Sequence, residues 1–138
     1  MAAMPVIFQK HIKREDARRN PFVLYVFGDN VARKGFGGQA AELRGEPNAV
    51  GVRTKYTPGE MYFVEAPLET EAQKKMIDED MRRLFKHVQQ GGIVVWPSAG
   101  IGTNRARMAI TAPTTFEYLQ GKLEALILAG RAPAVLHG

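Results

Sequence analysis

The sequence predicts an α/β fold arranged as a three-layer α/β/α sandwich. Short apolar segments rich in β-branched and aromatic residues alternate along the chain with segments of helical period. Two of the apolar segments, residues 22–27 and 93–96, end in glycine-rich loops that lead into helical patterns. Alternating strands and helices form a sheet that helices cover, so this order indicates layers. With 138 residues, the chain is expected to form one domain, residues 1–138, with its own core.

The first half of the chain is expected to supply most of the strands. Residues 22–27 are apolar and β-branched, and they predict a buried strand. Gly28, Asp29 and Asn30 have the chemistry of a turn, so this strand is predicted to stop at Gly28. The other elements predicted here are strands over residues 4–12, 49–54 and 61–66, a helix over residues 39–43 and a charged connector over residues 13–21.

The second half is expected to add two long helices. Residues 70–90 form the clearest helix, because Thr70 and Gln73 have the spacing of a capping box and an apolar face follows. Residues 114–129 have a similar start at Thr114. The two apolar faces consist of Met76 or Ile77, Met81, Leu84, Phe85 and Val88, and of Leu119, Leu123, Leu126 and Ile127. The remaining predictions are a strand over residues 93–96 with Trp96 in the core, a helix over residues 105–110, and an edge strand or frayed tail over residues 132–136.

The composition limits the classes of protein and partner. There is no cysteine, which excludes disulfides, thiolate metal sites and a cysteine nucleophile. No apolar run reaches the roughly 18 residues of a membrane span, and the start lacks a signal-peptide pattern, so a cytoplasmic protein without a membrane partner is expected. The net charge of +5 fits either an anionic partner or solubility alone. The basic residues Lys10, Lys13, Arg14, Arg18 and Arg19 are interpreted as a solvated face, with contact to a ligand or a polynucleotide as the alternative.

A glycine-rich loop follows the predicted strand of residues 22–27. Gly35, Gly37 and Gly38 leave the backbone with little side-chain cover, and good helix formers begin at Gln39. Backbone N–H groups and the helix dipole point the same way at such a junction, which predicts an anion-binding site. Glycines at such a junction also serve tight packing, so this loop alone supports both interpretations.

A second loop of the same kind favours the anion-binding interpretation. The apolar residues 93–96 end at Pro97, and a turn of small residues extends to Thr103 before a helical pattern begins. Two such loops at strand ends face each other across a cleft, where open α/β sheets bind their ligands. Arg105 and Arg107 follow the second loop closely, so contact with a bound phosphate is expected of either.

These two loops resemble the ligand-binding loops of macro domains. In that family an Asn, here Asn30, precedes a run of glycines and a helix. A segment of the form Pro-small-small-Gly-x-Gly, here residues 97–102, follows a later strand. The resemblance spans residues 22–108. Four segments are similar in detail to a little-characterised macro-like family that is common in bacteriophages and bacteria: residues 27–30, 37–40, 44–49 and 54–55.

The resemblance implies a macro domain-like mixed sheet and a cleft that holds ADP-ribose, in a bacterial or phage-infected cell. The second loop of macro domains wraps the distal phosphate and ribose, and an Asn at the position of Asn30 contacts the distal ribose. Lys55, at a strand end, is kept as a phosphate ligand because of the resemblance. The residues expected to bind the ligand are Gly28, Asp29, Asn30, Gly35, Gly37, Gly38, Gln39, Thr54, Lys55, Pro97, Ser98, Ala99, Gly100, Ile101, Gly102, Thr103 and Arg105.

The expected cleft is poor in catalytic groups. His11, His87 and His137 lie outside both loops and no pair has metal-ligand spacing, so neither a metal nor a cofactor is predicted. Macro domains that hydrolyse ADP-ribosyl bonds tend to carry an Asp two residues after the glycine run, where this chain has Ala40. Three roles are open to Asp29: accepting hydrogen bonds from an adenine amine or a ribose hydroxyl, orienting a water, or capping its own turn.

Three functions are considered, in descending order of support. The first is binding of ADP-ribose or a related nucleotide-derived ligand between the two glycine-rich loops, and sequestration of a host nucleotide signal is one use for a phage-encoded protein. The second is an ADP-ribosyl hydrolase or phosphatase acting on ADP-ribosylated substrates, with Asp29 and Asn30 as the catalytic residues and with Asp29 or Glu42 in place of the Asp that is missing at Ala40. The third is nucleic-acid binding through residues 10–19, which lack the interleaved aromatic residues of single-strand platforms. The oligomeric state is left open.

Overall fold

The computed structural model describes residues 4–131, which form an α/β fold. The predicted edge strand or tail over residues 132–136 lies outside these residues. In chain order the elements are β1 (Val6–Gln9), α1 (Arg14–Arg19), β2 (Leu24–Asn30), α2 (Ala40–Leu43), β3 (Ala49–Lys55), α3 (Pro67–Gln89), β4 (Val94–Pro97), α4 (Met108–Thr111) and α5 (Pro113–Arg131).

The four strands form one sheet in the order β1-β4-β2-β3, and each neighbouring pair is parallel. The expectation of a mixed sheet is therefore wrong for these strands. An antiparallel bridge between Lys55 and Tyr62 lies outside them. Because the strands run the same way, their C-terminal ends meet at one edge, which is where parallel sheets build ligand sites.

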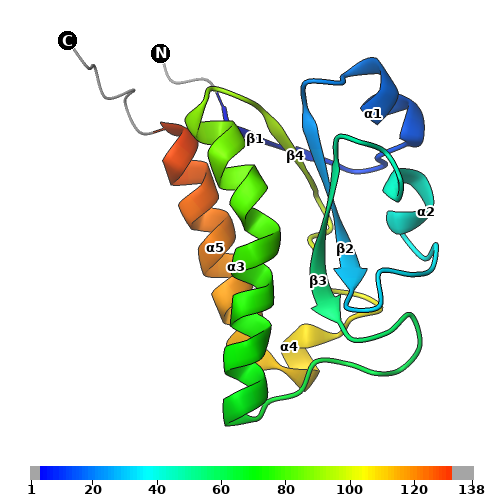
Figure 1. The fold of residues 1–138 in the computed structure, drawn as a ribbon, viewed down its shortest axis with the longest axis vertical. Helices are drawn as coiled ribbons and strands as arrows, with labels where there is room; N and C mark the ends of the chain where they lie inside the picture. Colours follow the sequence, from blue (N-terminus) through cyan, green and yellow to red (C-terminus); the bar gives the residue numbers. More distant parts are fainter. Residues whose placement is uncertain (1–3, 132–138) are drawn as a thin grey trace.

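Helices cover both faces of the sheet (Figure 1). The long helices α3 and α5 lie side by side against one face, where Val26 and Trp96 of the sheet pack with Met81 of α3. The short helices α1 and α2 lie against the other face, where Tyr25 packs with Leu43 of α2. Neighbouring residues of β2 alternate between the two clusters, as the pleat of a strand requires. The expected place of Trp96 in the core is confirmed, since 2% of its surface is exposed.

The two long helices are confirmed, but α3 begins earlier than predicted. Of the expected inward residues, Ile77, Met81, Leu84 and Val88 of α3 and Leu119 and Leu126 of α5 are buried, while Phe85, Leu123 and Ile127 are partly buried against the same core. Helix α3 begins at Pro67, three residues before the predicted capping box. The side chain of Gln73 donates to the Tyr56 hydroxyl instead, and it accepts a hydrogen bond from Thr115. None of the helices within residues 4–131 is long and apolar enough to cross a membrane.

The predicted end of β2 is wrong because long-range pairing extends the strand. Gly28 and Asp29 pair with Val52 and Arg53 of β3, so β2 continues to Asn30. A register shift in the ladder follows Asp29.

Two further segments differ from the prediction. Residues 61–66 are not a strand: Tyr62 forms one isolated bridge with Lys55, and Phe63 is buried with its ring edge-on to that of Tyr56, the ring centroids 4.9 Å apart. The charged connector contains helix α1, which forms because Ala17 is fully buried against the sheet while its neighbours face solvent.

Candidate functional site

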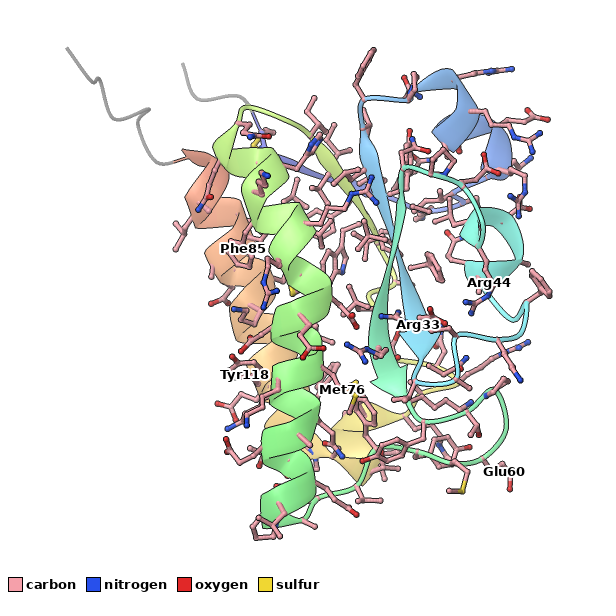
Figure 2. All side chains as sticks on the ribbon, in the orientation of Figure 1. Arg33, Arg44, Glu60, Met76, Phe85 and Tyr118 are labelled. Carbon is pink, nitrogen blue, oxygen red and sulfur yellow. The ribbon has the colours of Figure 1, made fainter. Side chains whose placement is uncertain are left out.

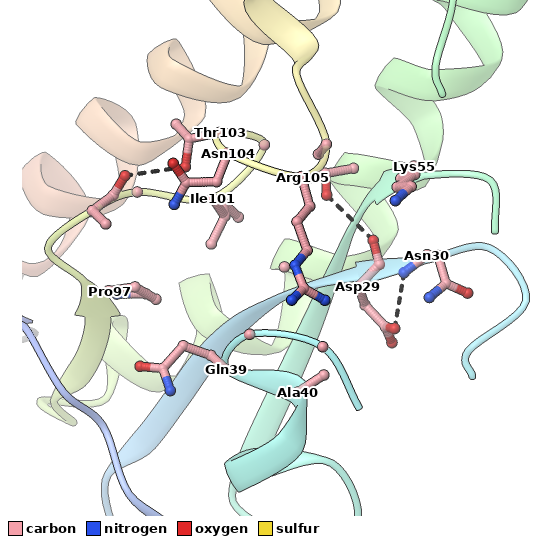
Figure 3. A pocket seen from close by; sticks show the side chains of 18 of the residues that line it. Asp29, Asn30, Gln39, Ala40, Lys55, Pro97, Ile101, Thr103, Asn104 and Arg105 are labelled. Carbon is pink, nitrogen blue, oxygen red and sulfur yellow. Dashed lines mark hydrogen bonds between the residues drawn. The ribbon is translucent and has the colours of Figure 1, made fainter. Parts of the chain in front are cut away.

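A cavity of about 970 Å³ lies at the edge of the sheet where the parallel strands end (Figure 3). A loop after each of the four strands contributes to its wall. All seventeen residues in the list of expected ligand contacts line this cavity, but Arg107, of which phosphate contact was also expected, does not. Several lining residues were not assigned from the sequence, among them Lys10, His11, Lys13, Lys34 and Arg44.

The first glycine loop offers unused backbone donors. Gly35 and Gly38 have φ values of +91° and +56°, which favour glycine over other residues. Within residues 4–131, no hydrogen bond uses the N–H groups of residues 35–39. Backbone N–H groups are strong hydrogen-bond donors, so a loop with several free N–H groups can bind an anion.

The second loop has the same property. Its carbonyl groups close the turn, since Pro97 accepts from the N–H of Gly100 at 2.8 Å and Gly102 accepts from that of Met108 at 2.9 Å. The N–H groups of Ala99 and of residues 101–105 donate to no other described residue. Gly102 has a φ of +75°, and an added Cβ would lie 2.5 Å from Sδ of Met108, so this position requires glycine.

Arg105 and Lys55 bring positive charge to the space between the loops. Arg105 extends from the second loop to the first, where its guanidinium occupies the space that a Cβ on Gly37 would need (Figure 3). Nζ of Lys55 donates to the Pro58 carbonyl at 3.2 Å. Burial, and then the charge of Arg105, lowers the pKa of Lys55, while Glu60 opposes the shift. Neither cation forms a salt bridge with a described carboxylate, so an anion between the loops would stabilise both.

The carboxylate of Asp29 is held by two arginines, Arg33 and Arg44, whose side chains are labelled in Figure 2. Nη2 of Arg44 lies 2.5 Å from Oδ1 of Asp29, and Nη1 of Arg33 lies 3.0 Å from Oδ2. The N–H of Asn30 also donates to Oδ1, at 2.8 Å. Burial alone raises the pKa of Asp29, but the hydrogen bonds from Arg44, Asn30 and Arg33 together hold it below its usual value. Its two oxygens are therefore occupied by the protein itself.

Three other predicted contact residues use their side chains within the protein. Nδ2 of Asn30 donates to the Lys34 carbonyl at 2.8 Å, and Oγ1 of Thr54 donates to the Asp29 carbonyl at 3.3 Å. The side-chain amide of Gln39 forms two hydrogen bonds with the backbone of Ile12. Its Oε1 accepts from the N–H of Ile12 at 3.1 Å, and its Nε2 donates to the carbonyl of Ile12 at 2.9 Å. These three side chains shape the loops through contacts within the protein.

The histidines differ in their relation to the cavity. His11 lies outside both loops in the sequence but lines the cavity, because β1 ends beside β4. His87 lies half-buried on α3 and does not line the cavity. Within residues 4–131, no three side chains of the metal-binding types gather closely enough to hold an ion.

One family model matches a stretch of the chain that includes every residue lining the cavity. The model of a family of unknown function, DUF7831, matches residues 7–122, which include all four loops. The chain belongs to the DUF7831 family. No curated protein and no solved structure matches this DUF7831 chain.

Proposed function

We propose that the chain binds ADP-ribose or a related nucleotide-derived ligand in this cavity, on a macro-like three-layer α/β/α sandwich. The observation that carries the proposal is the meeting of two glycine loops with unused N–H groups beside Lys55 and Arg105. A diphosphate requires backbone donors and positive charge in one place. The volume of about 970 Å³ lies within the usual range of small-molecule sites.

The choice of ADP-ribose rests on the order of the cavity residues along the chain. Asn30, the glycine run that follows it and residues 97–102 resemble the two loops with which macro domains hold ADP-ribose. The buried side chain of Ile101 and the ring of Pro97 add apolar surface beside the donors, which suits a ribose or a base.

Binding has stronger support than turnover. The carboxylate of Asp29 is engaged by two arginines, and Oε2 of Glu42 accepts from the N–H of Arg14 at 3.0 Å. Ala40, in the position where ADP-ribosyl hydrolases tend to have an Asp, is buried. A separate nucleic-acid surface has less support, because Arg14 and Arg18 both pair with Glu46.

Calorimetric titration of ADP-ribose into Arg105→Gln tests the proposal. Loss of a charged hydrogen bond to phosphate is expected to weaken binding by about tenfold. Arg107→Gln is the matched control, because Arg107 is an exposed arginine of the same segment that does not line the cavity. Its affinity should equal that of the wild type.

Two results would overturn the proposal. One is the absence of heat with ADP-ribose, ADP and cyclic nucleotides at high micromolar concentration. The other is an equal loss of affinity in Arg105→Gln and Arg107→Gln, which would place the ligand outside the cavity.

A further inference from the structure

The cavity extends along the whole C-terminal edge of the sheet. The loop after β1 lines one end and the loop after β3 lines the other, with β4 and β2 between them. Neighbouring strands lie about 4.8 Å apart, so the two ends are separated by roughly 14 Å. Six lysines or arginines line this space against two carboxylates, Asp29 and Glu42.

Four of these six side chains lie at two separate places in this space; of the other two, Arg44 pairs with Asp29 and Lys34 belongs to the loop after β2. Lys55 and Arg105 lie near the ends of β3 and β2, where the proposed diphosphate site is. Lys10 and Lys13 lie at the opposite end, in the loop between β1 and α1. Neither Lys10 nor Lys13 forms a salt bridge with a carboxylate of residues 4–131, although carboxylates are close in the sequence.

The loop that presents Lys10 and Lys13 is anchored between them. Ile12 is 1% exposed, and its N–H and carbonyl are both bonded to the side chain of Gln39. The N–H of Arg14 is bonded to Glu42, and its guanidinium pairs with Glu46. The backbone therefore holds both lysines at the cavity wall before any ligand binds.

The carboxylates near this end already have partners. Oδ2 of Asp16 accepts from Nε2 of Gln9 at 2.8 Å and from the N–H of Lys13 at 2.9 Å. Glu42 accepts from the N–H of Arg14, and Glu46 pairs with both Arg14 and Arg18. The ammonium groups of the two lysines thus have no carboxylate partner at this end.

We propose that the ligand carries a second anionic group, separate from its diphosphate, and that Lys10 and Lys13 bind this group. The inference rests on the proposed function and names the ligand class more closely: a nucleotide-derived molecule with phosphates at two positions. A ligand with a single diphosphate would neutralise the charge near Lys55 and Arg105 and leave the other end of the cavity unmatched.

Calorimetry with three ligands tests this inference: ADP-ribose, ADP-ribose 2′-phosphate and ADP-ribose 1″-phosphate. The two derivatives carry the added phosphate at opposite ends, so one of them reaches Lys10 and Lys13 whichever way the ligand lies. The wild type is expected to bind that derivative about tenfold more tightly than ADP-ribose, the size of one charged hydrogen bond. In Lys10→Gln/Lys13→Gln the gain should fall below about twofold, while affinity for ADP-ribose itself stays near the wild-type value.

The matched control is Lys75→Gln/Lys86→Gln. It removes two exposed lysines of α3 that do not line the cavity, so the gain should persist. If neither derivative binds more tightly than ADP-ribose, or if the gain survives in Lys10→Gln/Lys13→Gln, the second site is wrong and the proposed function stands. If a derivative binds in a lysine-dependent way and ADP-ribose does not, ADP-ribose is the wrong ligand and the second site stands. If none of the three binds, both proposals fail.

Discussion

Two groups of charged side chains lie at the same end of the sheet and differ in how their charge is balanced. The buried arginine cluster, named for its two buried carboxylates Asp29 and Asp80, also contains Arg33, Arg44 and Arg53. Each of its arginines contacts a carboxylate at 2.5–3.0 Å. The cavity cations are Lys10, Lys13, Lys55 and Arg105, and none of them forms a salt bridge within the described part of the chain.

This difference separates charge that serves folding from charge that serves binding. A carboxylate as buried as Asp29, with 2% of its side chain exposed, is costly without partners, so the fold supplies two arginines. The cavity cations retain solvent and need no partner for folding. Cations that the fold brings together without a counter-charge are therefore the better indicator of an anionic ligand.

The largest expected effect is on folding, from Asp29→Asn. This change leaves Arg44, which is 16% exposed, without its carboxylate and weakens the contact to Arg33. Removing one partner of a buried ion pair costs at least about 3 kcal/mol of unfolding free energy. We expect a loss near this lower value, because Arg33 still pairs with Asp80. Urea unfolding at neutral pH measures the loss.

Glu15→Gln is the control for this change. Glu15 pairs with Arg19 at 3.9 Å and both side chains are 76% exposed, so its loss should stay within about 0.5 kcal/mol. Equal losses in the two variants would mean that burial does not decide how much an ion pair contributes to stability.

The loss of stability in Asp29→Asn should become smaller as the pH falls. The folded-state pKa of Asp29 lies below its usual value, so its charge stabilises the fold fully above the unfolded-state pKa of about 3.9. This contribution is lost as the pH falls through the lowered folded-state pKa. The difference in unfolding free energy between wild type and Asp29→Asn should shrink over that acid range, and a constant difference would contradict the ionic origin.

A smaller loss of stability is expected from Gly51→Ala, which crowds the buried arginine cluster from β3. An added Cβ would lie 2.7 Å from Oδ2 of Asp29 and 3.0 Å from Cζ of Phe27. Crowding a packed core costs about 1–3 kcal/mol, measurable by urea unfolding. The control is Gly121→Ala in α5, where a Cβ meets nothing within 4 Å, so stability should be unchanged or rise by up to about 1 kcal/mol. If the unfolding free energy of Gly51→Ala equals that of the wild type, the side chains of the cluster rearrange to accommodate the added methyl group at little cost.

The smallest expected effect on stability comes from Lys55→Gln, in the cavity. Burial and Arg105 already disfavour the charged lysine, so removing it should leave unfolding unchanged while the affinity for ADP-ribose falls about tenfold. A bound phosphate favours the ammonium form, so wild-type affinity should decrease as the pH rises through the lowered pKa of Lys55. In Lys55→Arg the affinity should stay constant over the same pH range, because arginine remains charged. A loss of stability in Lys55→Gln would place Lys55 with the structural charges.

Local sequence patterns predicted the helices and strands whose conformation depends on residues that are close in the chain. The 3.6-residue period located α3 and α5 and named their buried residues, and β-branched runs located β3 and β4. The glycines at residues 35–38 and 100–102 marked the two loops of the cavity, because positive φ is a property of single residues.

The parts of the site that were missed depend on which strands lie side by side. Lys10 and His11 reach the cavity because β1 is next to β4, a neighbour about ninety residues away in the chain. Gln39 was expected to touch the ligand, but its amide is occupied by Ile12. No local signal shows that a polar side chain will find its partner in a distant segment.

The sequence by itself determined the class of the fold, the long helices and the backbone of both glycine loops, because hydrophobic period and glycine content act over a few residues. The tertiary structure decided the all-parallel strand order, the continuation of β2 through Asp29 and the pairing of that carboxylate with Arg33 and Arg44. It also decided which cations at the cavity have no carboxylate partner among the described residues. These outcomes depend on burial and on contacts between distant segments, where the cost of an unpaired buried charge selects the arrangement.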